Sequence, residues 1–161
     1  MSGSLLKLLR ELSQREIEYV VVGGMAAVLH GAPVVTADID IVHRRTPENV
    51  SALLEVLREL EARLRYDARK LFPSEAHLLG QGHILLATSL GPIDLLCEVQ
   101  GEGYEELLPH AQELKLGEGL ATKVLGLEKL IEQKMGAGRP KDHMALPILR
   151  ATLDELKKRQ H

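Results

Sequence analysis

The chain of 161 residues is long enough for one domain with at most a small appended lobe. Hydrophobic residues make up 45% of it and charged residues 27%, a composition that excludes a disordered or fibrous protein. The formal net charge of −3 and the aromatic content of 2% argue against a dedicated nucleic-acid-binding module. They do not exclude an enzyme that meets an RNA end through a local basic patch.

The sequence carries no signal of export or membrane insertion. The segment Met1–Glu11 lacks a basic region followed by an apolar stretch and a cleavage site. No apolar run approaches the ~18 residues of a membrane span. Cys97 is the only cysteine, so an internal disulfide is impossible, and no zinc-ligand spacing occurs. We therefore expect a cytoplasmic protein without a membrane segment.

The first hundred residues mix helical and strand patterns. Helical spacing of apolar residues, β-branched runs, strict alternation and Gly or Pro breaks define the elements. In chain order we expect a helix around 5–12, a strand at 19–22, a short helix at 25–30, a strand at 37–42, a long helix whose apolar stripe reaches residue 64, and strands at 83–87 and 93–99.

The later part of the chain is mostly helical in pattern. Residues 107–120 are ambiguous and read best as a short helix followed by an edge strand. One helix begins near Leu127 and ends at Gly136 or Gly138, and a final helix from about Pro140 should be kinked or divided by Pro147. This order predicts an α+β fold in a single domain over 1–161, with a core of about 15–100 and a helical C-terminal part of about 120–161.

The pattern Asp38-Ile39-Asp40-Ile41 carries the clearest chemical signal. Acids two positions apart on a strand project from the same face, with Cα atoms roughly 6.5–7 Å apart. Their oxygens suit hard cations such as Mg²⁺ or Mn²⁺. Asp94 also lies between two apolar residues and would join the pair if its strand lies beside theirs. The alternative is an ordinary solvated face of a half-buried sheet.

The glycine pair Gly23-Gly24 ends the strand that precedes these acids. Two glycines can simply permit a tight strand-to-helix turn. They can also expose backbone N–H groups that a phosphate approaches closely. Lys134 continues the apolar stripe of its helix, so its ammonium group either reaches a phosphate or extends to water.

The stretch Val22–Val42 resembles the nucleotidyltransferase superfamily, which has the polymerase-beta-like fold. More narrowly, it is similar to the small prokaryotic nucleotidyltransferases related to abortive-infection toxins, and Lys134 with the segment 138–142 resembles the C-terminal region of that group. The resemblance implies a small mixed sheet flanked by helices with a helical tail. It also implies transfer of a nucleoside monophosphate from NTP to a hydroxyl of a protein, a tRNA end or a small molecule.

The resemblance also assigns roles to individual residues. It implies that Asp38, Asp40 and Asp94 are catalytic and bind Mg²⁺ or Mn²⁺, with Asp94 helping to activate the attacking hydroxyl. Gly23 and Gly24 would contact the nucleotide phosphates. A patch formed by three basic residues would also bind the nucleotide; these are Lys134, Arg139 and Lys141.

Two positions depart from the family pattern. Relatives often carry basic residues where this chain has Val34 and Ala37, so positive charge near the triphosphate path is reduced. The alternative function is therefore a non-catalytic nucleotide-binding protein, or one half of a toxin–antitoxin pair that acts through a partner protein. The sequence leaves open which NTP and which acceptor are used.

Overall fold

A seven-stranded mixed sheet organises the protein in this computed structural model, which describes residues 3–117 and 119–160. The remaining positions of the expected 1–161 domain lie outside the described residues. The strand order is β3-β4-β5-β2-β1-β7-β6. The strand bounds are β1 Tyr19–Val22, β2 Ile39–His43, β3 Arg63–Leu64, β4 Ile84–Thr88, β5 Gly91–Leu95, β6 Ala111–Lys115 and β7 Ala121–Leu125.

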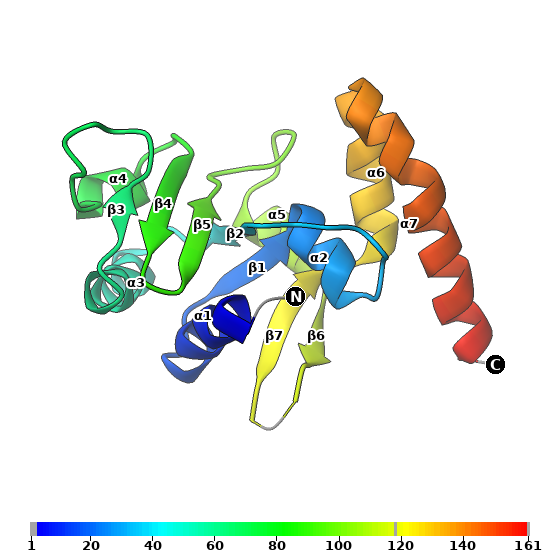
Figure 1. Cartoon of the computed structure of the whole chain (residues 1–161), viewed down its shortest axis with the longest axis horizontal. Helices are drawn as coiled ribbons and strands as arrows, with labels where there is room; N and C mark the ends of the chain where they lie inside the picture. The colour runs from blue at the N-terminus through cyan, green and yellow to red at the C-terminus, as the bar shows by residue number, and fades with distance from the viewer. Residues whose placement is uncertain (1–2, 118, 161) are drawn as a thin grey trace.

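Helices cover the sheet and extend beyond one of its ends. Figure 1 shows α3 and α4 at the β3 end, and α6 and α7 packed side by side at the other end. Among the described residues, no helix has the length and apolarity to cross a membrane. The helix bounds are α1 Gly3–Gln14, α2 Gly23–Leu29, α3 Pro47–Glu59, α4 Glu75–Leu79, α5 Tyr104–Leu107, the 3₁₀ turn Leu108–His110, α6 Leu127–Ala137 and α7 Pro140–Arg159.

The centre of the sheet brings two distant chain segments together. Strand β2 runs antiparallel to β1 and parallel to β5. In the second pairing Asp40 lies opposite Asp94. The neighbours Ile39, Ile41 and Ile93 are fully buried, so alternation along each strand directs the acids to the other face. The expected pairing of the two acid-bearing strands is confirmed.

Local chemistry explains several element boundaries. The Thr46 hydroxyl accepts a hydrogen bond from the Asn49 amide, and Pro47 occupies the first turn of α3. Gly138 ends α6 in the left-handed conformation with φ of 69°, which glycine adopts without steric cost. The expected α+β class, with a mixed sheet and a helical C-terminal tail, is confirmed.

Several boundaries differ from the sequence-based expectations. Helix α3 ends at Glu59 rather than reaching residue 64, because Glu61 has a φ of 55° and the chain then enters β3. Strand β5 ends at Leu95 instead of Val99. The part expected to be helical from about 120 begins with strand β7, and α7 continues through Pro147 without division.

Candidate active site

Three carboxylates gather around one guanidinium group on a face of the sheet. Asp38 directly precedes β2, Asp40 lies within it, and Asp94 is the register partner of Asp40 on β5. Arg65, just after β3, places Nη2 2.8 Å from Asp94 Oδ1 and 3.8 Å from Asp38 Oδ2. The structure therefore brings the three predicted acids together and adds a cation between two of them.

The carboxylates repel one another. Burial raises the pKa of Asp40 to about 7, assisted by the charge of Asp94, a hydrogen bond to Asp94 and the charge of Asp38. The charge of Arg65 opposes this rise. Near neutral pH the group therefore carries more negative charge than its one guanidinium compensates.

This charge bears on whether a divalent metal suits the site. As the side chains lie, the described part of the chain holds no group of three or more histidine, cysteine or acidic side chains arranged to bind a metal ion. The donors themselves are carboxylate oxygens, which hard cations prefer. Besides burial, the charges of Asp94 and Asp38 raise the pKa of Asp40, and a bound cation would offset those charges. Asp38, Asp40 and Asp94 therefore fit Mg²⁺ or Mn²⁺ chemically.

Glycine is required where β1 turns into α2. Gly23 has a φ of 64°, and a Cβ atom there would lie 2.7 Å from Asp40 Oδ2. At Gly24 a Cβ atom would lie 3.2 Å from the hydroxyl oxygen of Thr36, which itself donates to the Asp38 carbonyl. The Gly-Gly turn thus lies directly against the strand that carries the acids.

A small cavity of about 120 Å³ connects this turn to the C-terminal helices. Gly23, Gly24 and Lys134 line it. The Lys134 ammonium donates to Asp142 Oδ1 at 3.0 Å, and Asp142 has no exposed surface. The structure therefore brings one of the three predicted basic residues to the glycine turn.

The other two predicted nucleotide-binding residues lie elsewhere. Arg139 Nε donates to Asp142 Oδ2 at 2.7 Å, and the Arg139 side chain is largely exposed. Lys141 is exposed in the first turn of α7. Neither lines the cavity at the Gly-Gly turn, so their assignment to the nucleotide stays a prediction.

Sequence reasoning missed two residues that shape this region. Asp142 was visible only as part of the segment 138–142, and nothing in the pattern distinguished it from a solvated first-turn acid. Arg65 belongs to a run rich in Arg and Lys, and that composition was the available signal. Arg65 supplies positive charge beside the acids, where Val34 and Ala37 do not.

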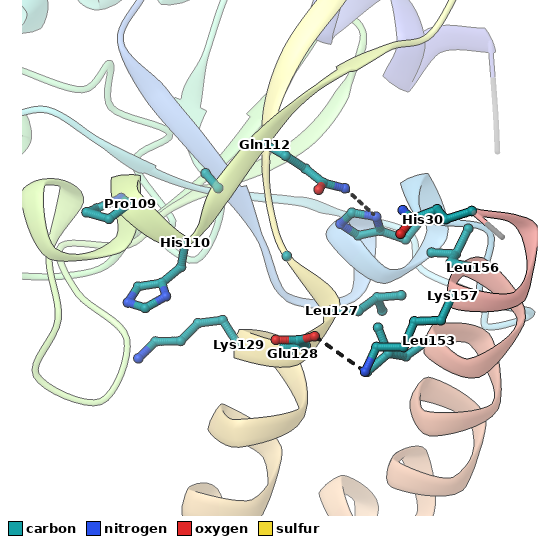
Figure 2. A pocket seen from close by; sticks show the side chains of 13 residues that line it. His30, Pro109, His110, Gln112, Leu127, Glu128, Lys129, Leu153, Leu156 and Lys157 are labelled. Atoms are coloured by element: carbon teal, nitrogen blue, oxygen red, sulfur yellow. Dashed lines mark hydrogen bonds and ion pairs between the residues drawn. The ribbon is translucent and has the colours of Figure 1, made fainter.

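A separate cavity of about 430 Å³ lies between β6, α6 and α7, and its lining includes none of the three carboxylates. Figure 2 shows two pairs among its polar side chains: Gln112 with His30, and Lys157 with Glu128. The His30 ring also bonds to the Leu125 carbonyl at 2.9 Å. We assign this cavity no part in chemistry at the acids.

One family model and three solved structures are similar to this chain. The model of the aminoglycoside-2''-adenylyltransferase family matches residues 4–80. A Thermotoga maritima protein described as a candidate nucleotidyltransferase is 19% identical, with a TM-score of 0.60 and coverage of 96% of each chain. The lincosamide antibiotic adenylyltransferase LnuA is 15% identical, with a TM-score of 0.63 and coverage of 94% of this chain and 98% of its own.

The antibiotic-resistance factor ANT(2'')-Ia is also similar in structure. It is 17% identical, with a TM-score of 0.58 and coverage of 95% of this chain and 82% of its own. No curated protein matches in sequence. The three solved structures confirm the expected fold, a mixed sheet flanked by helices.

Proposed function

Because the chain has the nucleotidyltransferase-superfamily fold, we propose that it transfers a nucleoside monophosphate from an NTP to an acceptor hydroxyl and releases pyrophosphate. The observation that carries the proposal is the gathering of Asp38, Asp40 and Asp94 beside the Gly-Gly turn. The matched adenylyltransferases support the same class of reaction.

The triphosphate lies along the Gly-Gly turn in this proposal. Phosphate oxygens need close approach to backbone N–H groups, and Gly23 and Gly24 present no Cβ atoms there. Lys134 lines the same cavity, and its ammonium donates hydrogen bonds to the phosphates. Asp142 holds the Lys134 side chain in place before nucleotide binds.

The acceptor hydroxyl lies on the opposite side of the acids, because attacking and leaving oxygens are roughly in line in phosphoryl transfer. The hydroxyl oxygen forms a bond to the α-phosphorus. The bond from that phosphorus to the oxygen bridging to the β-phosphate breaks, and pyrophosphate leaves with its electron pair. Asp94 takes the hydroxyl proton.

Asp38, Asp40 and Asp94 would hold Mg²⁺ or Mn²⁺, which when bound lowers the pKa of the acceptor hydroxyl and neutralises phosphate charge. Arg65 keeps Asp94 oriented through the hydrogen bond to its Oδ1.

Labelled nucleotide tests the proposal without knowledge of the acceptor. The protein is incubated with α-³²P-labelled NTPs, Mg²⁺ and a cell extract, and covalent label and pyrophosphate are measured. We expect both with the parent protein and neither with Asp94→Asn. Calorimetry with and without Mg²⁺ measures nucleotide binding separately. Binding of NTP without any covalent label would instead support the non-catalytic nucleotide-binding alternative.

A toxin or antitoxin partner protein is implied by the family resemblance alone and stays a prediction. Co-purification of a second protein that changes NTP turnover would test it.

A further inference from the structure

The sheet places two different surfaces on opposite sides of the carboxylates. Along the order β3-β4-β5-β2-β1, the segment 63–72 lies at one edge, the acids on β5 and β2 lie in the middle, and the Gly-Gly turn follows β1 (Figure 1). With the triphosphate at that turn, an in-line displacement brings the acceptor from the β3 side. The segment 63–72 is therefore the surface that an acceptor meets.

This segment is positively charged, although the chain as a whole is not. It contains four basic residues and one acid, a formal charge of +3, whereas the chain carries −3. Arg69 pairs with the single acid, Asp67, at 3.1 Å, and Arg65 reaches the carboxylates. The Lys70 ammonium donates to the Arg65 backbone carbonyl. Apart from these pairs, Arg63 and Lys70 leave the segment a positive surface that attracts anions.

The same segment holds both of the exposed Tyr and Phe rings among the described residues. The chain has three Tyr, one Phe and no Trp. Tyr19 and Tyr104 are buried, whereas Tyr66 is 79% exposed and Phe72 is 49% exposed. The Arg63 guanidinium lies 3.2 Å from the centroid of the Phe72 ring. Exposed rings interleaved with cations are the pattern on which unpaired bases stack while their phosphates are neutralised.

The segment is also continuous with the acids. Arg65, beside the Tyr66 ring, bonds to Asp94, and the Arg65 amide bonds to the Leu85 carbonyl. Leu85 is the register partner of Asp94 and forms part of the wall of a hollow of about 510 Å³ that Tyr66 also lines. Tyr66 is thus linked to Asp94 through Arg65 and lines a hollow whose wall includes the register partner of Asp94.

We propose that the segment 63–72 binds the 3′ end of a single-stranded polynucleotide, whose terminal hydroxyl is the acceptor. This assignment rests on the proposed function and names its second substrate. The backbone phosphates lie along Arg63, Arg69 and Lys70, and bases stack on Tyr66 and Phe72. The terminal 3′-oxygen forms the bond to the α-phosphorus of NTP, pyrophosphate leaves, and Asp94 takes the 3′-hydroxyl proton.

Binding is tested first, without nucleotide. The probe is a fluorescein-labelled single-stranded RNA of about ten nucleotides, within the ~4–16 nucleotide site size of single-strand binders, followed by anisotropy. We expect Tyr66→Ala to weaken binding about 5- to 150-fold, the range for removal of one base-stacking ring. Arg69→Gln should reduce the slope of log affinity against log salt by about 0.7.

A matched variant separates this surface from general charge effects. Arg58→Gln removes an exposed Arg on α3, outside the segment, and should leave RNA affinity unchanged. Because Tyr66 is exposed, Tyr66→Ala should keep the melting temperature of the parent. RNA binding that Tyr66→Ala and Arg69→Gln do not weaken, or weaker RNA binding by Arg58→Gln alone, would overturn the proposal.

The transfer experiment separates this inference from the proposed function. With labelled NTP and Mg²⁺, RNA with a free 3′-hydroxyl should gain label, and RNA with a 3′-phosphate should not. Label that enters a protein or an aminoglycoside but not RNA overturns the acceptor assignment and leaves the proposed function standing. If RNA binds through Tyr66 but no acceptor gains label, the proposed function and the acceptor assignment both fail, whereas the RNA-binding surface is confirmed.

Discussion

The two cationic groups beside the carboxylates differ in how they are held. On the phosphate side, the side defined by the Gly-Gly turn and Lys134, two cations converge on a carboxylate with no exposed surface, Asp142. Hydrogen bonds from Arg139 and Lys134 lower the pKa of Asp142 to about 2 despite its burial. On the acceptor side, defined by the segment 63–72, the cations lie beside exposed aromatic rings.

This difference matches the demands of the two proposed ligands. A triphosphate has the same form in every turnover, so a cation that is already positioned stabilises it without reorganisation. A strand end reaches the site from solvent, and open cations with flat rings can receive it. The carboxylates lie between the two sides and act on both proposed ligands. Variants of these carboxylates should therefore have the largest effect on nucleotidyl transfer.

Asp40→Asn should lower the rate of nucleotidyl transfer by about 10²–10³-fold or more, because it removes charge that stabilises the reacting group. In EDTA the variant should melt higher than the parent, since it removes a carboxylate whose pKa is raised to about 7 by burial first and then by the charges of Asp94 and Asp38. The gain should be about 2–4 °C for each kcal/mol relieved. Label transfer and thermal melts measure both effects.

The same variant should lose most of the Mg²⁺-induced rise in melting temperature, which follows from binding to the folded state. The two stability effects must occur together. A lower melting temperature in EDTA with a full response to Mg²⁺ would make Asp40 a structural residue. The two sides would then have no reactive centre between them.

Lys134→Met sharpens the comparison from the phosphate side. Loss of one charged hydrogen bond should weaken Mg²⁺-dependent NTP binding about 10- to 150-fold in calorimetry. From the sequence alone Met suits the helix stripe and should preserve stability. The ion pair with buried Asp142 changes that expectation, and we expect a loss of about 1–3 kcal/mol in urea unfolding. Lys157→Met, which changes an exposed lysine on α7, is the control.

The carboxylate strands were predictable because their signal is local. Alternation with a period of two places Asp38 and Asp40 on one face whatever the rest of the chain does. The strand at Tyr19–Val22 is a short β-branched run closed by glycines, and the structure keeps those bounds. The approach of Asp94 was only conditional, because it depends on the order of strands in the sheet rather than on any local pattern.

The surroundings of the acids were not predictable in the same way. Strand β3 has two residues, too few for a period, and the apolar stripe of α3 continues into it through Leu64. Arg65 therefore had no assigned position. Asp142 lies in the first turn of a helix, where an acid is ordinarily exposed; only the approach of α6 buries it against Lys134. Both residues depend on tertiary packing.

Gly23→Ala tests how tightly the phosphate side joins the acids. The left-handed φ of 64° costs a non-glycine residue about 1–2 kcal/mol. The new Cβ would also meet Asp40 Oδ2 at 2.7 Å, so the total loss in urea unfolding should exceed that strain. Gly119→Ala is the matched control, with a φ of 69° and no atom within 4 Å. Equal losses in the two variants would show that Asp40 moves aside freely.

Arg65→Gln tests the acceptor side through the titration of Asp40. The Arg65 charge lowers the pKa of Asp40, while burial, Asp94 and Asp38 raise it, and the balance is about 7. Without Arg65 the apparent pKa of Asp40 should rise further. Carbon-detected NMR titration in EDTA measures this shift. Arg63→Gln, whose guanidinium lies on an aromatic ring instead, should leave it unchanged.

The sign of the stability effect follows from the protons bound. The unfolded Asp40 carboxyl titrates near 3.8, so between there and about 7 the folded protein holds a proton that the unfolded chain has lost. The free energy of unfolding therefore falls as pH rises through this window, by at most ~1.4 kcal/mol per pH unit from this group. In Arg65→Gln the fall should extend to higher pH, so urea unfolding at pH 5 and pH 8 should differ more than in the parent. An unchanged difference would mean that Arg65 does not compensate the carboxylates, and the acceptor side would then be electrostatically separate from the acids it lies against.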